Sequence, residues 1–216
     1  MLSELRFGSL LAYSPRGDSD LAKRSRTAMV ELKSDRVGGR SRLPMSERVA
    51  RLIAAQVAEM PFADFFGDDA ALVPVPRSGL LKPGSLWVPD RLARALVAAG
   101  LGSEVLPCLR RVKAVPKASL SPARQRPLPE AHYESMSVER QLASPARILL
   151  IDDVVTRGST LLGAARRIER AYPAIDIRAF AAMRTVSNPA DLSAIRDPVV
   201  GTIRFREASG DTLRRP

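Results

Sequence analysis

The amino-acid sequence predicts an α/β protein in which a parallel sheet is covered by helices on both faces. Short apolar runs at residues 70–75, 147–151 and 176–183 have the length of buried strands. The first two runs are followed by segments 89–99 and 159–171, whose apolar residues recur with the helical period. Strands that alternate with helices in this way are typical of a parallel sheet. The chain of 216 residues is long enough for one such domain.

Residues 1–66 are predicted to form a helical extension, or hood, ahead of this sheet. One helix is expected over residues 20–33, and a second one begins near Ser46, its candidate cap, and ends at Pro61. Either of two polar residues can cap the first helix by accepting hydrogen bonds from its first turn. They are Ser19 and Asp20.

The rest of the chain is predicted to hold the core of the domain and a C-terminal addition. Residues 67–184 form the core, which also contains a short strand at 104–106 and a long loop at 110–130. Loops of that length inside a compact domain are usually functional or disordered. Residues 185–216 are expected to add one hood strand at 199–205 and then to end in a frayed tail.

Composition and charge exclude some classes of protein and leave others open. With Cys108 as its one cysteine, the chain holds no internal disulfide and no cysteine-based zinc site, so no zinc is expected. No apolar run approaches the roughly 20 residues that span a bilayer. The first residues also lack the order of a signal peptide, so we expect a cytoplasmic protein without membrane contact. The net charge of +11 attracts polyanions, either nucleic acid or a phosphorylated small molecule, unless it only reflects a basic composition.

Residues 148–160 carry the strongest functional pattern in the chain. An apolar strand is followed by Asp152 and Asp153, then by a turn rich in hydroxyls and glycine, and then by a helix. Ligands bind at the carboxyl ends of strands in open α/β sheets, and a helix N-terminus favours an anion. Ionised carboxylates accept hydrogen bonds from sugar hydroxyls but repel phosphate. The pattern therefore predicts a phosphorylated sugar, with its diol at the acids and its phosphate in the turn. The alternative is an ordinary strand-to-helix turn with two capping acids. A Walker-type loop is excluded because no Gly-Lys-Ser/Thr follows.

All thirteen positions of residues 148–160 resemble the signature with which type I phosphoribosyltransferases bind 5-phosphoribosyl-1-diphosphate (PRPP). The resemblance implies a Rossmann-like fold with a small hood. It also implies that the turn after the first core strand binds pyrophosphate. The PRPP-binding residues expected on this basis are Asp152, Asp153, Val154, Val155, Thr156, Arg157, Gly158, Ser159 and Thr160 from the signature, and Pro76, Arg77 and Ser78 from that turn.

Weaker similarities point to the ComF branch of this family, which is associated with competence and DNA uptake. They cover residues 72–79 with Gly84, residues 91–96, residues 109–113 with Leu120, Gln125 and Arg126, and residues 32–38, which include Lys33. The chain departs from the branch in two respects. It lacks the N-terminal cysteine zinc module, and residues 84–87 replace an expected Gly-Phe-Asn-Gln segment. These departures concern the DNA-uptake role and leave the PRPP signature intact.

The resemblance implies transfer of phosphoribosyl from PRPP to a nitrogenous base or another small acceptor, with release of pyrophosphate. Mg²⁺ is expected as the cofactor, held by Asp152 and Asp153 only indirectly, through the ribose or water. In the family a loop such as 110–130 covers PRPP as a lid, so Arg111 and Lys113 are expected to act in catalysis by stabilising the leaving pyrophosphate.

Several alternatives stay open at this stage. The chain could instead be a non-catalytic module that senses PRPP or a nucleotide, or a regulator that binds nucleic acid weakly through its basic surface. A structural protein with a degenerate site is disfavoured by the intact acid pair. The acceptor is expected to be recognised by a hood built from residues 1–20 and parts of 185–207. The sequence does not decide between a homodimer and a complex with a partner protein. The lone histidine, His132, is expected to be structural rather than catalytic.

Overall fold

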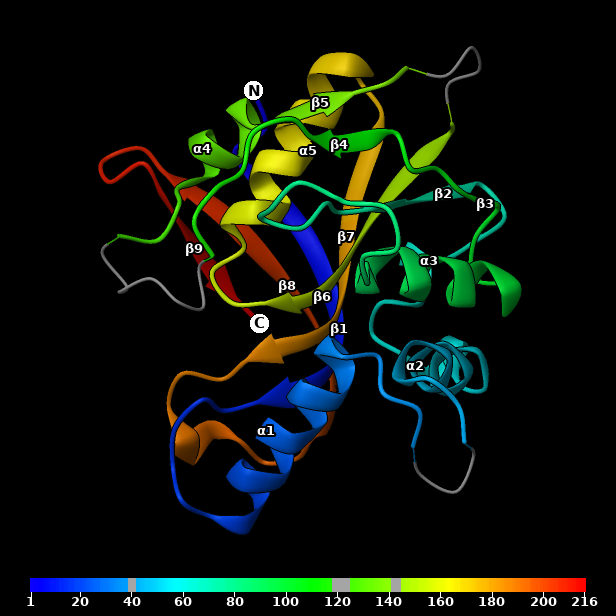
Figure 1. Ribbon diagram of the computed structural model, residues 1–216, viewed down its shortest axis with the longest axis vertical. Helices are drawn as coiled ribbons and strands as arrows, with labels where there is room; N and C mark the ends of the chain where they lie inside the picture. The colour runs from blue at the N-terminus through cyan, green and yellow to red at the C-terminus, as the bar shows by residue number, and fades with distance from the viewer. Residues whose placement is uncertain (39–41, 118–124, 141–144) are drawn as a thin grey trace.

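The computed structural model describes residues 1–38, 42–117, 125–140 and 145–216, and it is an α/β structure built on a seven-stranded sheet (Figure 1). The strand order is β3-β2-β6-β7-β1-β8-β9. The strands are β1 (Glu4–Tyr13), β2 (Ala70–Pro74), β3 (Glu104–Val105), β6 (Arg147–Val155), β7 (Asp176–Thr185), β8 (Arg196–Arg206) and β9 (Asp211–Arg215). Pairing is parallel from β3 to β1, and β8 and β9 are antiparallel to their neighbours. The predicted α/β class with a largely parallel sheet is confirmed.

Helices cover both faces of the sheet, as predicted. The helices are α1 (Asp20–Lys33), α2 (Met45–Ala54), α3 (Val88–Ala98), α4 (Pro129–Glu134) and α5 (Ser159–Ala171), with short 3-10 turns at Val57–Glu59, Ala63–Phe65 and Pro189–Asp191. Because side chains alternate along a strand, Leu150 of β6 packs in one core with Leu161 of α5, whereas Leu149 packs in the other with Leu92 of α3. A two-stranded ribbon of β4 (Leu109–Arg111) and β5 (Met136–Val138) lies beside α5.

The start of the chain differs from the prediction of a helical extension. Residues 4–13 form β1, which lies inside the sheet between β7 and β8. Its residues are buried toward both cores: Phe7 faces the α5 side and Leu10 the α2 and α3 side. A Cβ atom on Gly8 would lie 2.8 Å from the Cβ atom of Phe62, so the glycine leaves room for that ring. Gly8 and Ser9 interrupt the apolar run, which is why the strand pattern was missed.

The end of the chain is a paired strand and not the predicted frayed tail. β9 pairs antiparallel with β8, with Thr202 opposite Arg215, and the turn between them ends at Gly210, whose φ is 63°. Glycine adopts this conformation without strain. β9 is rich in charged residues, as edge strands commonly are, and that composition made it look like a solvated tail.

Other boundaries also shift. Ser19 caps α1 as predicted, by accepting a hydrogen bond from the backbone N–H of Ala22. α2 ends at Ala54, before Pro61, and Ser46 lies inside it instead of capping it. The predicted long loop at 110–130 contains the end of β4 and the start of α4, and its residues 118–124 lie outside the described residues.

Among the described residues, no helix has both the length and the apolar character needed to cross a membrane.

The close packing of α4 on α5 gives a first testable prediction. A Cβ atom on Gly163 of α5 would lie 2.6 Å from the carbonyl oxygen of Pro129 and 2.7 Å from the Cβ atom of His132. Alanine normally stabilises a helix interior by up to about 1 kcal/mol over glycine. We expect Gly163→Ala to reverse that sign and lower the free energy of unfolding by about 1–2 kcal/mol, because backbone atoms must move. Urea unfolding checks this, and a stabilised variant would contradict it.

Candidate functional site

The acid pair lies at the carboxyl end of β6, a central strand. The strand continues beyond its predicted end at residue 151 and includes Asp152 and Asp153. The neighbouring strand β2 ends beside Ile151, and the backbone N–H of Val75 donates to the carbonyl oxygen of Ile151 at 2.9 Å. The turn at residues 76–78 therefore emerges next to the acid pair. The structure thus brings together the two segments that the sequence analysis expected to bind PRPP.

The two carboxylates share a restricted space. Burial, and next the charge of Asp153, raise the pKa of Asp152 well above its ordinary value. The backbone N–H of Asp153 acts in the opposite direction on the pKa of Asp152, because it donates to Asp152 Oδ1 at 2.9 Å. The backbone N–H of Val154 donates to Asp153 Oδ1. The site therefore favours any ligand or cation that offsets the charge of the pair.

Lys33, the last residue of α1, supplies one such positive charge. Its Nζ lies 3.2 Å from Asp153 Oδ2. Burial acts to lower the pKa of Lys33, but the carboxylates of Asp153 and Asp152 raise it above its ordinary value. Lys33 was not among the site residues predicted from the sequence. The only signal was its place in a segment that resembles the ComF branch, because the two residues stand 120 positions apart.

The turn after β6 has the backbone expected of an anion site. Gly158 is the N-cap of α5 and has a φ of 87°, and a Cβ atom there would lie 2.6 Å from Ile203 Cδ1. Only glycine meets both demands. The first N–H groups of a helix have no acceptor within the helix, and the helix dipole adds favourable potential for a negative group. We call residues 156–160 the phosphate turn after the ligand that the sequence predicts for it; the turn places a left-handed glycine directly before the N-terminus of α5.

The hydroxyls of this turn are oriented by protein partners. Thr156 Oγ1 lies 3.0 Å from Thr185 Oγ1, and Ser159 Oγ lies 3.1 Å from Thr212 Oγ1. Thr160 Oγ1 lies 3.3 Å from His132 Nε2. A hydroxyl has one donor and two acceptor positions, so each keeps capacity for a ligand while its direction is restricted.

Other signature residues have mainly structural side chains. Val155 is buried in the core beneath α5, and Val154 packs against the opposite core. Arg157 forms an ion pair with Asp211 of β9. Of these residues, the backbone is the part available to a ligand.

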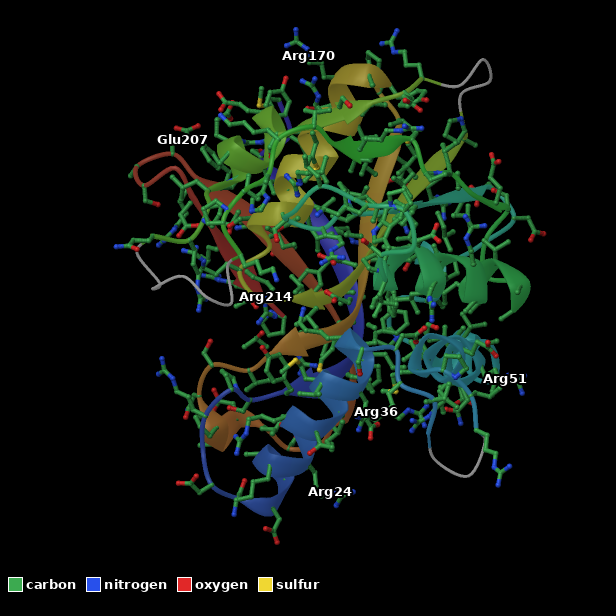
Figure 2. All side chains as sticks on the ribbon, viewed as in Figure 1. Arg24, Arg36, Arg51, Arg170, Glu207 and Arg214 are labelled. Carbon is green, nitrogen blue, oxygen red and sulfur yellow. The ribbon has the colours of Figure 1, made fainter. Side chains whose placement is uncertain are left out.

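The C-terminal strand holds the phosphate turn in place. Arg214 Nε donates to the carbonyl oxygen of Thr156 at 2.6 Å, and Arg214 Nη2 donates to that of Thr185. Figure 2 shows Arg214 near the centre of the view, close to the end of β6, whereas Arg24 and Arg51 lie at the periphery. Burial, and next the charge of Arg184, lower the pKa of Arg214 to about 10. This contribution was not predicted, because residues 210–216 were expected to be a frayed tail.

Arg111 is positioned differently from the expected lid cation. It is buried at the end of β4, where its Nε donates to the carbonyl oxygen of Arg77 at 2.9 Å and its Nη2 to that of Pro76 at 3.3 Å. Its Nη1 donates to Ser135 Oγ. Burial lowers the pKa of Arg111 to about 10, against the attraction of Asp152, which raises it. Arg111 therefore supports the turn at residues 76–78 by binding its backbone carbonyl oxygens.

The remaining predicted cations are exposed. Lys113 lies on the surface, and its backbone N–H donates to the carbonyl oxygen of Ser135 at 3.3 Å. Arg77 is also exposed, and its Nη1 donates to the carbonyl oxygen of Leu86 at 3.2 Å. Ser78 is half-buried, and its carbonyl oxygen accepts from the N–H of Val115 at 2.9 Å.

Comparison with models of protein families and with curated proteins finds no match to this chain.

The buried His132 gives a prediction about pH. Burial, and next the charge of Arg111, lower its pKa to about 4, against an ordinary value near 6.5. The unfolded chain therefore binds a proton at a higher pH than the folded one, so stability falls as pH drops from about 6.5 to about 4. We expect this residue to contribute up to about 3 kcal/mol to that loss. Urea unfolding at pH 7 and pH 4.5 should show a smaller loss for His132→Gln; equal losses would contradict the prediction.

Support of the phosphate turn by β9 gives another prediction. Arg214→Ala leaves the carbonyl oxygens of Thr156 and Thr185 without their donor, at a cost of about 1–3 kcal/mol for each buried acceptor that water does not reach. We expect faster hydrogen exchange at residues 156–160 and lower stability. The exposed neighbour Arg215 provides the control, Arg215→Ala, which should change neither. If hydrogen exchange at residues 156–160 is unchanged in the Arg214 variant, the turn is stable without support from β9, and the prediction is wrong.

Proposed function

We propose that this chain is a type I phosphoribosyltransferase, which binds PRPP with Mg²⁺ and transfers the phosphoribosyl group to a nitrogenous base or another small acceptor. One observation carries the proposal. The acid pair Asp152 and Asp153, the phosphate turn at residues 156–160 and the turn at residues 76–78 meet at the carboxyl edge of neighbouring strands. The α/β fold, with helices on both faces of a largely parallel sheet, is compatible with the type I fold.

The three parts of PRPP, which are the 5-phosphate, the ribose hydroxyls and the diphosphate, each match one part of this site. The 5-phosphate suits the N-terminus of α5, where N–H groups and the helix dipole favour an anion. The ribose hydroxyls suit carboxylate oxygens of Asp152 and Asp153, which accept hydrogen bonds. The diphosphate on C1 then lies toward β2 and residues 76–78. This arrangement keeps both phosphate groups away from the two carboxylates.

The proposed reaction is a displacement at C1 of the ribose with inversion. A nitrogen lone pair of the acceptor forms the new bond to C1, and the bond from C1 to the diphosphate oxygen breaks with its electron pair. The diphosphate leaves as pyrophosphate, and the acceptor nitrogen loses its proton to solvent or to the leaving group. No residue needs to form a covalent intermediate, so positioning and charge stabilisation are what the protein supplies.

The acid pair fits Mg²⁺ as a partner of the substrate. The repulsion that helps to raise the pKa of Asp152 is offset by a divalent cation nearby. Mg²⁺ usually keeps several waters and is held by one or two carboxylates together with substrate phosphates. Asp152 and Asp153 would hold it through water or the ribose. When bound, the ion supplies charge neutralisation for the diphosphate.

The acceptor is proposed to bind under the elements beyond this edge of the sheet. Within the expected hood segment of residues 1–20, residues 4–13 form strand β1 of the sheet. A small cover is built by α1 and the segment after β7, which pack through Ala22 and Leu192 against Ala12 of β1. Figure 1 shows the two segments side by side. Because α1 ends at Lys33 beside the acid pair, this cover borders the site.

PRPP with Mg²⁺ should raise the stability of the protein, since a ligand that binds only the folded state adds about 2.7 kcal/mol at one hundred times its Kd. Replacing Asp152 and Asp153 together by asparagine should abolish the effect, while the free protein stays folded because two repelling charges are removed. Asp68→Asn with Asp69→Asn is the matched control: another adjacent acid pair, before the amino end of β2. Thermal unfolding with and without PRPP measures the effect.

A panel of bases and nucleotides then tests for transfer through release of pyrophosphate. Release with one acceptor supports the enzyme. PRPP binding without release for any acceptor would favour the alternative, a module that senses PRPP. A protein that PRPP does not stabilise would contradict the proposed function altogether.

A further inference from the structure

Lys33 is held close to the acid pair by the chain segment that follows α1. Two residues later, Asp35 has a φ of 45° and a buried carboxylate. Asp35 Oδ1 accepts from the backbone N–H of Ser46 at 2.8 Å, and Asp35 Oδ2 lies 3.1 Å from Arg91 Nη1. These contacts join the end of α1 to α2 and α3. The position at which Lys33 leaves the backbone is therefore set by the fold.

The acid pair has one cation on each side of the sheet. Alternation along β6 does not continue through the acid pair, because Val154 packs against the α3 core and Val155 in the α5 core. The partners distinguish the two carboxylates instead: Asp152 acts on Arg111, whose ribbon packs in the α5 core, and Asp153 pairs with Lys33, which follows Leu32 of the α3 core. Arg111 is buried and is committed to the backbone of residues 76–77. Lys33 is different: 48% of its side chain is exposed, and its flexible stem carries a compact charge that can turn to another partner.

The location of Lys33 favours the diphosphate end of the ligand over the 5-phosphate end. The phosphate turn leads into α5, on the other face of β6. By contrast, Lys33 is connected through Asp35 and Arg91 to α3, and α3 begins where the loop from residues 76–78 ends. Arg77 donates to the carbonyl oxygen of Leu86, just before α3. Lys33 and the turn at residues 76–78 are thus both connected to the N-terminal half of α3.

On the basis of the proposed function, we infer that Lys33 is a diphosphate-binding residue that changes partners. In the free protein its ammonium group pairs with Asp153. When PRPP arrives, Asp153 accepts a ribose hydroxyl, and the ammonium group donates to a diphosphate oxygen on the neighbouring carbon. The pairing in the free protein keeps the lysine in place and offsets the charge of the carboxylate until the substrate replaces it.

Titration calorimetry with three probes in Mg²⁺ buffer tests this inference: PRPP, inorganic pyrophosphate and ribose 5-phosphate. Lys33→Met should weaken PRPP and pyrophosphate at least tenfold. The affinity for ribose 5-phosphate should stay unchanged or increase, since Asp153 no longer has a competing partner. Lys33→Arg should recover part of the PRPP affinity by restoring the charge. The control is Lys23→Met, an exposed lysine on the same helix, which should bind all three probes as the unmodified protein does.

The outcomes separate this inference from the proposed function. Loss of PRPP and pyrophosphate alone supports a diphosphate contact. Equal loss of all three probes, with unchanged urea unfolding, would overturn it, because Lys33 would then only organise the acid pair. Unchanged binding of all three would also overturn it. If the unmodified protein binds no PRPP, the proposed function itself fails, and the role of Lys33 fails with it.

Discussion

The arrangement of the whole site depends on the cost of placing two adjacent carboxylates at the end of a buried strand. Charged groups lose hydration when they are buried, and two like charges at close range add to that cost. Asp152 shows the consequence in its raised pKa. Two cations offset the negative charge of the pair from opposite faces of the sheet: Lys33 at the end of α1 and Arg111 at the end of β4. Both helix and ribbon are therefore tied to the acid pair by charge as well as by packing.

The phosphate turn depends on a different constraint, the left-handed backbone at Gly158 pressed against Ile203. Ile203 belongs to β8, and Arg214 of β9 binds the carbonyl oxygen of Thr156. The antiparallel hairpin at the end of the chain thus shapes a turn formed in the middle of the sequence. The two antiparallel strands therefore have a structural role at the turn: β8 packs against Gly158 through Ile203, and β9 binds the Thr156 carbonyl oxygen through Arg214.

Local patterns predicted the parts of the protein whose interactions are local in sequence. The β6 strand, the acid pair, the turn and α5 are consecutive, and an uninterrupted motif identified them. β1 was missed because Gly8 and Ser9 break its apolar run, although its register with β7 and β8 is what buries it. The contact between Lys33 and Asp153, and the support of the turn by β9, leave no local pattern at all. They arise only when distant segments meet, so reasoning from spacing could not find them.

The choice of cation at each position follows from what that position has to do. Arg111 and Arg184 are buried and Arg214 is half-buried, and each donates to backbone carbonyl oxygens from a planar group with fixed geometry. Such a group suits a permanent support, because several acceptors hold it at once and none needs to change. Lysine carries one compact charge on a flexible stem, and Lys33 stands half-exposed at the acid pair. A lysine at the acid pair and arginines bound to the backbone of the turns are the distribution expected for this proposal. The arginines keep the framework fixed, and the lysine is free to change its partner when the ligand binds.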